Sequence, residues 1–378
     1  DYEALSRVLY RLLEHDQIGP DRKLALWMEQ GELLGDHLMQ AERAIEAWRQ
    51  VLAFDPTNQI ALDNLERVFL QESRWEEAAA ILEMKLDTID DQHDRVELLL
   101  RIADIWETKI MDRDRAADFY EGILENDPTN EQAAAQLESI YREQGSEDAW
   151  GKLANLYLDR SQYKVDDPEA FLEARRASAR VFEEFLGQPE GSFLVLLTAF
   201  TAATYEDEQL LVDLGRLAGM TGLWAELIGQ VEDVLREIGD VPEASDIHKM
   251  VGRWQSEELG APEEAVYHLQ RALAIEPDNS VVMDDLERLY REIAAWEELS
   301  QVLTARVRLS ADPDEQMEIW RKLGELYELQ MGDVDNAVAA YRRILDIDPS
   351  DILAIESLER IYEAYDRWED LIRILQQK

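Results

Sequence analysis

An internal repeat runs through the whole chain and limits the folds that are open to it. Turn strings of the type Asp-Pro-Thr-Asn recur around Pro56 and Pro128, which lie 72 positions apart, and again around Pro277 and Pro349, also 72 positions apart. An alanine stands twelve residues before each of these prolines, and a leucine followed ten residues later by tryptophan occurs in four copies. Three independent markers therefore give a period near 72 residues.

The spacing of apolar residues within each period predicts helices rather than strands. Ile102, Ile105 and Trp106, for example, follow the rhythm of one helical face, and no run shows the period-two alternation of a strand. Proline lacks an N–H group and ends helices, and the Asp, Asn and Thr residues beside it are natural N-caps. The connections are so short that neighbouring helices must be antiparallel. We therefore expect an all-α fold with four helices, in two hairpins, per period.

The residues of one period resemble the tetratricopeptide repeat. Seven residues follow one another in the order of that family's pattern. They are Trp320, Leu323, Gly324, Tyr327, Ala337, Tyr341 and Pro349. The resemblance implies a right-handed α-solenoid of about nine to ten stacked helix pairs, of a bacterial type with a super-repeat of two hairpins. Alternate hairpins depart from the pattern, because Glu replaces the usual small residue at Glu66, Glu138, Glu287 and Glu359. The true unit is therefore a pair of unlike hairpins.

One part of the chain departs from the regular pattern. We expect regular hairpins in residues 1–160 and 207–378, and a degenerate repeat with an insertion in residues 161–206, all within one continuous solenoid that is a segment of a longer protein. The degenerate part contains a stretch, residues 193–200, that is apolar on every side. This stretch is either a buried helix or an interface for a partner or a second copy. The residues of that interface would be Phe193, Leu196, Leu197 and Phe200.

The composition excludes several classes of function. Asp and Glu number 83 against 38 Lys and Arg, and the net charge of -45 disfavours nucleic acids and anionic membranes as partners. No apolar stretch reaches the ~18 residues of a membrane helix. The absence of cysteine excludes disulfides, thiolate nucleophiles and thiolate metal sites. We expect a soluble protein, of the cytoplasm or the periplasm, whose compartment the sequence leaves unknown.

No group of residues predicts catalysis, a cofactor or a metal. The five histidines show no spacing that would place two ligands on one helical face, and we expect surface or packing roles for His15, His37, His93, His248 and His268. Asp87, Asp90, Asp91 and Asp94 are close together but lack the pattern of an EF-hand. There is no glycine-rich phosphate loop. We therefore expect no enzyme activity in this chain.

The resemblance implies instead a concave groove, lined by the first helix of each hairpin, that holds a segment of a partner protein. The positions carried over from the family are Arg67, Lys249, Arg253, Arg288, Arg291, Arg321, Arg360, Glu325 and Glu328. The arginines would select an acidic partner, whereas the acidic groove and surface would select a basic one. A third reading is that the arginines pair with neighbouring carboxylates. The predicted function is a non-catalytic interaction scaffold. The alternatives are an array that self-associates, and a segment that recruits substrate for a larger enzyme.

Overall fold

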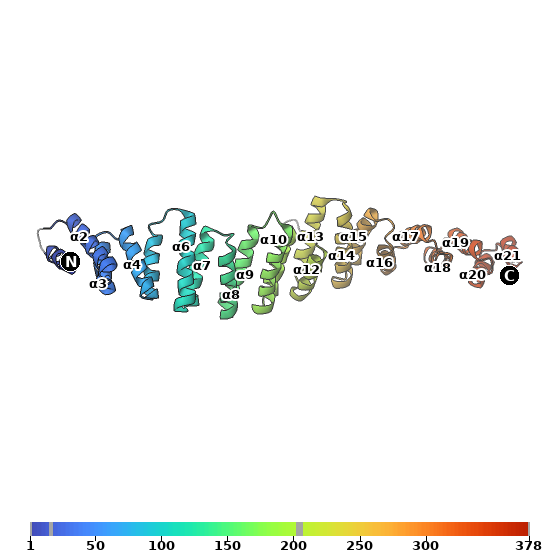
Figure 1. Cartoon of the computed structure of the whole chain (residues 1–378). Helices are drawn as coiled ribbons and strands as arrows, with labels where there is room; N and C mark the ends of the chain where they lie inside the picture. Colours follow the sequence, from blue (N-terminus) through green and yellow to red (C-terminus); the bar gives the residue numbers. More distant parts are fainter. Residues whose placement is uncertain (1, 15–17, 202–206, 377–378) are drawn as a thin grey trace. The chain divides into compact units, whose positions relative to one another are not determined.

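The structure, a computed structural model, describes residues 2–14, 18–201 and 207–376, and these residues form helices and no strands (Figure 1). They divide into two compact units, residues 1–192 and 193–378, with the boundary inside α11 (Pro189–Thr201). This boundary lies within the range 161–206 that the sequence marks as irregular. Of that range, residues 202–206 are outside the described part, as is His15.

The first unit consists of helices that follow one another, each packed against its neighbours in the chain. They are α1 (Tyr2–Leu13), α2 (Pro20–Glu32), α3 (Ala41–Phe54), α4 (Gln59–Gln71), α5 (Trp75–Leu86), α6 (Gln92–Asp104), α7 (Arg113–Asn126), α8 (Glu131–Gln144), α9 (Glu147–Gln162) and α10 (Pro168–Arg180).

The second unit is built in the same way. Its helices after α11 are α12 (Glu208–Thr221), α13 (Trp224–Ile238), α14 (Pro242–Arg253), α15 (Pro262–Ile275), α16 (Ser280–Glu292), α17 (Trp296–Leu309), α18 (Pro313–Glu325), α19 (Val334–Ile347), α20 (Ile352–Ala364) and α21 (Trp368–Leu375). We call the even-numbered helices from α2 to α20 the A helices, because each is the first of a hairpin, and their partners the B helices. The described residues thus form ten hairpins after α1, which confirms the all-α array of helix pairs.

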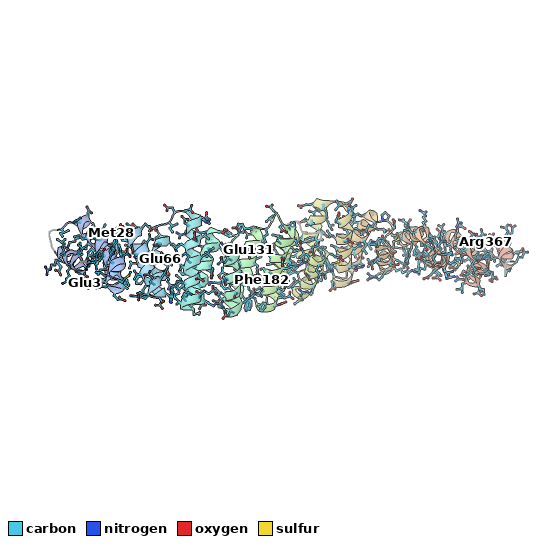
Figure 2. The ribbon with its side chains drawn as sticks, viewed as in Figure 1. Glu3, Met28, Glu66, Glu131, Phe182 and Arg367 are labelled. Atoms are coloured by element: carbon cyan, nitrogen blue, oxygen red, sulfur yellow. The ribbon has the colours of Figure 1, made fainter. Side chains whose placement is uncertain are left out.

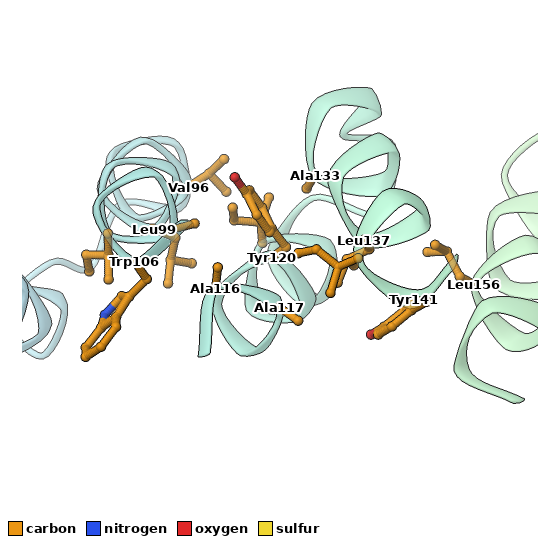
Figure 3. Close-up of a cluster of buried hydrophobic side chains, with 14 of the residues drawn as sticks. Val96, Leu99, Trp106, Ala116, Ala117, Tyr120, Ala133, Leu137, Tyr141 and Leu156 are labelled. Atoms are coloured by element: carbon orange, nitrogen blue, oxygen red, sulfur yellow. The ribbon is translucent and has the colours of Figure 1, made fainter. Parts of the chain in front are cut away.

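Buried side chains form successive clusters between neighbouring helices instead of one central core. The cluster in Figure 3 joins Leu99 and Trp106 to Ala116 and Tyr120 of the next helix, and then to Leu137 of α8. Separate clusters join α2 to α5, α15 to α19, and α18 to α21. Each hairpin therefore covers the apolar face of its neighbour, and stability accumulates along the chain.

Small residues allow the two helices of a hairpin to approach closely, as the sequence predicts. A Cβ atom added at Gly324 would lie 2.7 Å from the ring of Tyr341, and one added at Gly31 would lie 2.5 Å from the ring of Trp48. Ala337 has no exposed surface. These positions hold Gly or Ala because no larger side chain fits between the helices.

The repeated turn strings work as caps. In the first of them, Asp55 accepts hydrogen bonds from the backbone and hydroxyl of Thr57, and the Asn58 amide oxygen accepts one from the Ala61 N–H at 3.1 Å. Asp127 and Asn130, and Asp348 and Asp351, make the same contacts in their own turns. The bond from Asn58 holds the pKa of Asp55 below its ordinary value.

The hairpins alternate between two lengths because every second A helix ends in a π-helical turn. The five turns are η1 (Leu33–His37), η2 (Ile105–Ile110), η3 (Val181–Phe185), η4 (Trp254–Glu258) and η5 (Leu326–Met331). A π-turn bonds residue i to residue i+5, as the Leu38 N–H does with the Leu33 carbonyl at 3.1 Å, and so takes up one extra residue. Accordingly Met39, in the connection, follows Gly31 by eight residues, whereas Ser73 follows Glu66 by seven.

The π-turns also receive aromatic rings from the preceding B helix. Trp150, at the start of α9, stacks on Phe185 of η3 with ring centroids 4.0 Å apart, and Trp224 lies 5.8 Å from Trp254 of η4. Lys109 of η2 lies over the ring of Trp75. Trp75, Trp150 and Trp224 thus pack against the next hairpin, whereas Trp368 is exposed.

The connection between the A and B helices contains one residue in the left-handed region in each hairpin. Glycine holds this position at Gly145, Gly187, Gly222, Gly260 and Gly332, and other residues hold it at Met39, Ser73, Met111, Ala294 and Asp366. A side chain with a Cβ atom is strained there, by about 1–2 kcal/mol per residue.

Replacing Ala294, whose φ is 57°, with glycine should therefore raise the free energy of unfolding by about 0.5–1 kcal/mol, after the extra flexibility of unfolded glycine is subtracted. Urea titration followed by circular dichroism measures the change. The matched control is Gly332→Ala, at φ 65°, which should lose a similar amount. A less stable Ala294→Gly variant would contradict the assignment of strain to this position.

Candidate functional site

The residues predicted to line a groove all lie on A helices or their π-turns. They are Arg67 of α4, Lys249 and Arg253 of α14, Arg288 and Arg291 of α16, Arg321 and Glu325 of α18, Glu328 of η5, and Arg360 of α20. Arg67 belongs to the first unit and the others to the second. We call the outer surface that the A helices of one unit form its A-helix face.

Three of the predicted cations make close ion pairs, of 3.0 Å or less, between consecutive A helices. Arg67 is 2.6 Å from Asp36 of η1, Arg360 is 3.0 Å from Glu328, and Arg321 is 2.9 Å from Asp351, the N-cap of α20. Glu328 also accepts a hydrogen bond from the Tyr341 hydroxyl at 3.3 Å. These pairs tie neighbouring hairpins together across the A-helix face.

The remaining four cations have partners as well. Lys249 pairs with Asp246 and lies 3.5 Å from Glu276. Arg253 and Arg288 are 3.7 and 3.8 Å from the same carboxylate, Asp285, and Arg291 is 2.7 Å from Glu287. All seven predicted cations thus meet carboxylates of their own chain, which is the third of the readings that the sequence leaves open. Their contact with a partner remains a prediction.

Two buried glutamates hold the array together at the positions where the family has a small residue. Glu66, labelled in Figure 2, is 9% exposed and binds Lys85 of α5 and Arg101 of α6. In the second unit Glu287, 5% exposed, lies 3.3 Å from Arg306 of α17 and 3.0 Å from Lys322 of α18. The two clusters occupy equivalent positions, with Lys and Arg exchanged. A buried carboxylate is tolerated here because cations from two helices satisfy it.

In the second unit, the equivalent position one period before Glu287 is apolar. Gly215 stands where Glu66 and Glu287 stand, and Met250 where Arg101 and Lys322 stand. The indole nitrogen of Trp254 would lie 2.8 Å from a Cβ atom at Gly215, so this ring fills the space of the missing glutamate side chain.

Three A helices line a depression beside this position. Its volume is about 340 Å³, and α12, α14 and α16 supply its walls. The lining residues are Glu208, Leu211, Glu243, Asp246, Ile247, Lys249, Met250, Arg253, Asn279 and Val281. Lys249 and Arg253 are the predicted groove residues that this depression brings together; the sequence did not single out its apolar residues.

A histidine pair, which sequence reasoning missed, is buried in the long hairpin of α14 and α15. The Nδ1 atoms of His248 and His268 are 2.9 Å apart, and His268 Nε2 is 3.5 Å from Glu232 of α13. Burial lowers the pKa of both rings to about 4, and for His248 the neighbouring His268 adds to the effect. A signal was present, because His248 takes the super-repeat position of Trp27 and Trp320. His37 and His93 are exposed.

The apolar stretch at 193–200 is a buried helix. Phe193, Leu196, Leu197 and Phe200 are all buried, which favours the buried helix over the interaction surface, the other reading that the sequence leaves open. A helix that is apolar on nearly all sides is typically buried. Leu194 and Thr198, between them, are the exposed residues of the stretch.

The aspartates at 87–94, which lack the pattern of an EF-hand, lie between the end of α5 and the first turn of α6. Asp91, in the aspartate cluster, is the N-cap of α6 and accepts hydrogen bonds from the backbone of His93 and Asp94. Among the described residues, no three His, Asp or Glu side chains are grouped in a way that could hold a metal ion. None of the described helices has the length and apolar character needed to cross a membrane.

Comparison with known proteins supports the family. Tetratricopeptide repeat models match residues 61–96 and 318–351, and no curated protein matches the chain. A crystal structure of MamA protein is 20% identical over 45% of this chain and 88% of its own, with a TM-score of 0.29. YrrB, described as a TPR protein with an unusual peptide-binding site, is 15% identical over 54% of this chain and 98% of its own, with a TM-score of 0.31.

A third similar structure, the human IFIT1 dimer with m7Gppp-AAAA, is 14% identical over 100% of this chain and 92% of its own, with a TM-score of 0.27. The family assignment rests on the two matched repeats and on the helical hairpins described above. This chain contains tetratricopeptide repeats at residues 61–96 and 318–351, within an array of helix pairs of the same kind.

Proposed function

We propose that this protein is a non-catalytic scaffold that holds a segment of a partner protein along the A-helix face. Tetratricopeptide repeat proteins generally mediate protein–protein interactions. The observation that supports this function here is the depression that three consecutive A helices, α12, α14 and α16, line together. A depression shared by several repeats suits an extended segment, which runs across helices and contacts each of them in turn.

The ion pairs on the A-helix face support the same function. Arg321 and Arg360 are fixed to neighbouring A helices, so the spacing of the side chains that a partner would meet is set before binding. A surface that is ordered in advance loses less conformational entropy on binding. The face can therefore act as a rigid template.

Photo-crosslinking from two positions of the second unit tests this function. A benzophenone amino acid replaces either Val281, on A helix α16, or Tyr267, on B helix α15; both side chains are more than half exposed. After irradiation in an extract of the native cells, we expect a discrete protein adduct from position 281 and none from position 267. Adducts from position 267 alone would contradict binding at the A-helix face.

A further inference from the structure

The depression between α12, α14 and α16 has an apolar floor. Leu211 and Ile247 are buried beneath it, and Met250 forms part of its wall. Val281, at its rim, is 52% exposed. A cavity of about 340 Å³ with such a lining suits an aliphatic side chain, which gains free energy when it leaves water.

The depression owes this character to the exchange of charged for apolar residues in one super-repeat. At the equivalent place in the first unit, Arg101 reaches across to the buried Glu66, and Lys322 reaches Glu287 in the same way further along the second unit. Met250 replaces these cations, and Gly215 replaces the glutamates. At the place of Arg101 and Lys322 the depression therefore presents the apolar side chain of Met250 instead of a cation.

The cations that line the depression already have ion-pair partners, whereas two of its carboxylates have none among the described residues. Its two cations already have carboxylate partners: Lys249 pairs with Asp246 and Glu276, and Arg253 with Asp285. Of its three exposed carboxylates, Asp246 pairs with Lys249, whereas Glu208 and Glu243 make no ion pair within the part of the chain that the structure describes. An acidic segment would have to displace existing ion pairs and approach a protein of net charge -45, whereas a basic segment would find two carboxylates without cations.

We propose that the segment held at this place is basic, and that it inserts one aliphatic side chain between α12, α14 and α16 while its Lys or Arg residues meet Glu208 and Glu243. This inference rests on the proposed function and names the chemistry of its partner. The apolar anchor gives affinity, and the flanking charges give orientation and a fast encounter.

Fluorescence anisotropy with three labelled peptides tests the proposal on the full chain. The first peptide is short, rich in lysine and has one central leucine; in the second, serine replaces the leucine; in the third, glutamate replaces every lysine. We expect the first peptide to bind, the second to bind about tenfold more weakly, and the third not to bind. Added salt should weaken the binding of the first peptide.

Two variants on the protein side use exposed residues, so that folding is preserved, which circular dichroism verifies. Glu243→Lys should weaken the lysine-rich peptide about tenfold or more at low salt. The matched control is Asp94→Lys, which makes the same change of charge at the equivalent position of α6 and should alter affinity by less than about twofold. Val281→Ser should reduce the advantage that the central leucine provides.

The outcomes separate this inference from the proposed function. Equal binding of the leucine and serine peptides, or equal effects of Glu243→Lys and Asp94→Lys, would overturn the inference. Tighter binding of the acidic peptide would also overturn it, although crosslinking from position 281 would still support the A-helix face. A loss of that crosslinking would remove the proposed function itself.

Discussion

Ala337→Asp is expected to lower the free energy of unfolding by about 3–5 kcal/mol. Ala337 has no exposed surface and lies in α19 at the contact with α18, where no room is left for a carboxylate. The new side chain would be larger than the space and would bring a charge without a partner. Urea or thermal unfolding followed by circular dichroism measures the loss.

The control for this variant lies two residues away in the same helix. Ala339 is exposed, and Ala339→Asp introduces the same residue on the outer side of α19. It should change the free energy of unfolding by less than about 0.5 kcal/mol. If Ala337→Asp unfolded at the same urea concentration as Ala339→Asp, the packing of α18 against α19 would be incorrect.

A second large effect is expected from acid, through the buried pair His248 and His268. Both rings have their pKa lowered from 6.5 to about 4, so the unfolded chain takes up protons at a higher pH than the folded one. Their contribution to stability is therefore complete above pH 6.5 and is lost as the pH falls toward 4. The loss amounts to at most about 3 kcal/mol for each ring.

The surroundings of the pair are of mixed charge. Arg271 opposes protonation of His248, Asp240 favours it, and Glu232 of α13 lies beside His268. Arg271 and Asp240 form an ion pair with each other. Burial therefore remains the dominant cause of the lowered pKa values.

The test compares the parent protein with His248→Phe, which puts an aromatic ring at the position where Trp27 and Trp320 stand in other repeats. The free energy of unfolding is measured in urea from pH 7 to pH 4.5. The parent should lose more stability over this range than the variant, because the carboxylates common to both proteins titrate alike. His93→Gln, at an exposed histidine, should follow the parent. Equal pH dependence of parent and His248→Phe would contradict the burial of the pair.

The sequence allowed the hairpins to be predicted because their markers return at a fixed spacing. Gly324 leaves room for the ring of Tyr341 across the two helices of a hairpin, and the Asp-Pro-Thr-Asn strings cap the next helix, so local residue types were sufficient. The π-turns were not predicted, since a π-turn adds a single residue and demands no particular residue type. Their one visible sign is the eight-residue step from Gly31 to Met39, against seven from Glu66 to Ser73.

The candidate site was predictable only in part. The cations of the A helices could be found from the repeat frame, but their partners lie about 30 residues away, as Asp36 does from Arg67, and depend on how one hairpin stacks on the next. The depression was not predictable, because its apolar wall depends on Met250, which stands where the equivalent helices carry Arg101 and Lys322. Apolarity alone left two readings open at 193–200, since it cannot distinguish a buried helix from an exposed one.

Hydrogen–deuterium exchange with and without the lysine-rich, leucine-containing peptide tests the central claim most directly. A segment held on the A-helix face should slow backbone exchange in α12, α14 and α16 and leave α13, α15 and α17 unchanged. Protection confined to the B helices, or none at a peptide concentration that saturates the anisotropy signal, would contradict binding at the A-helix face.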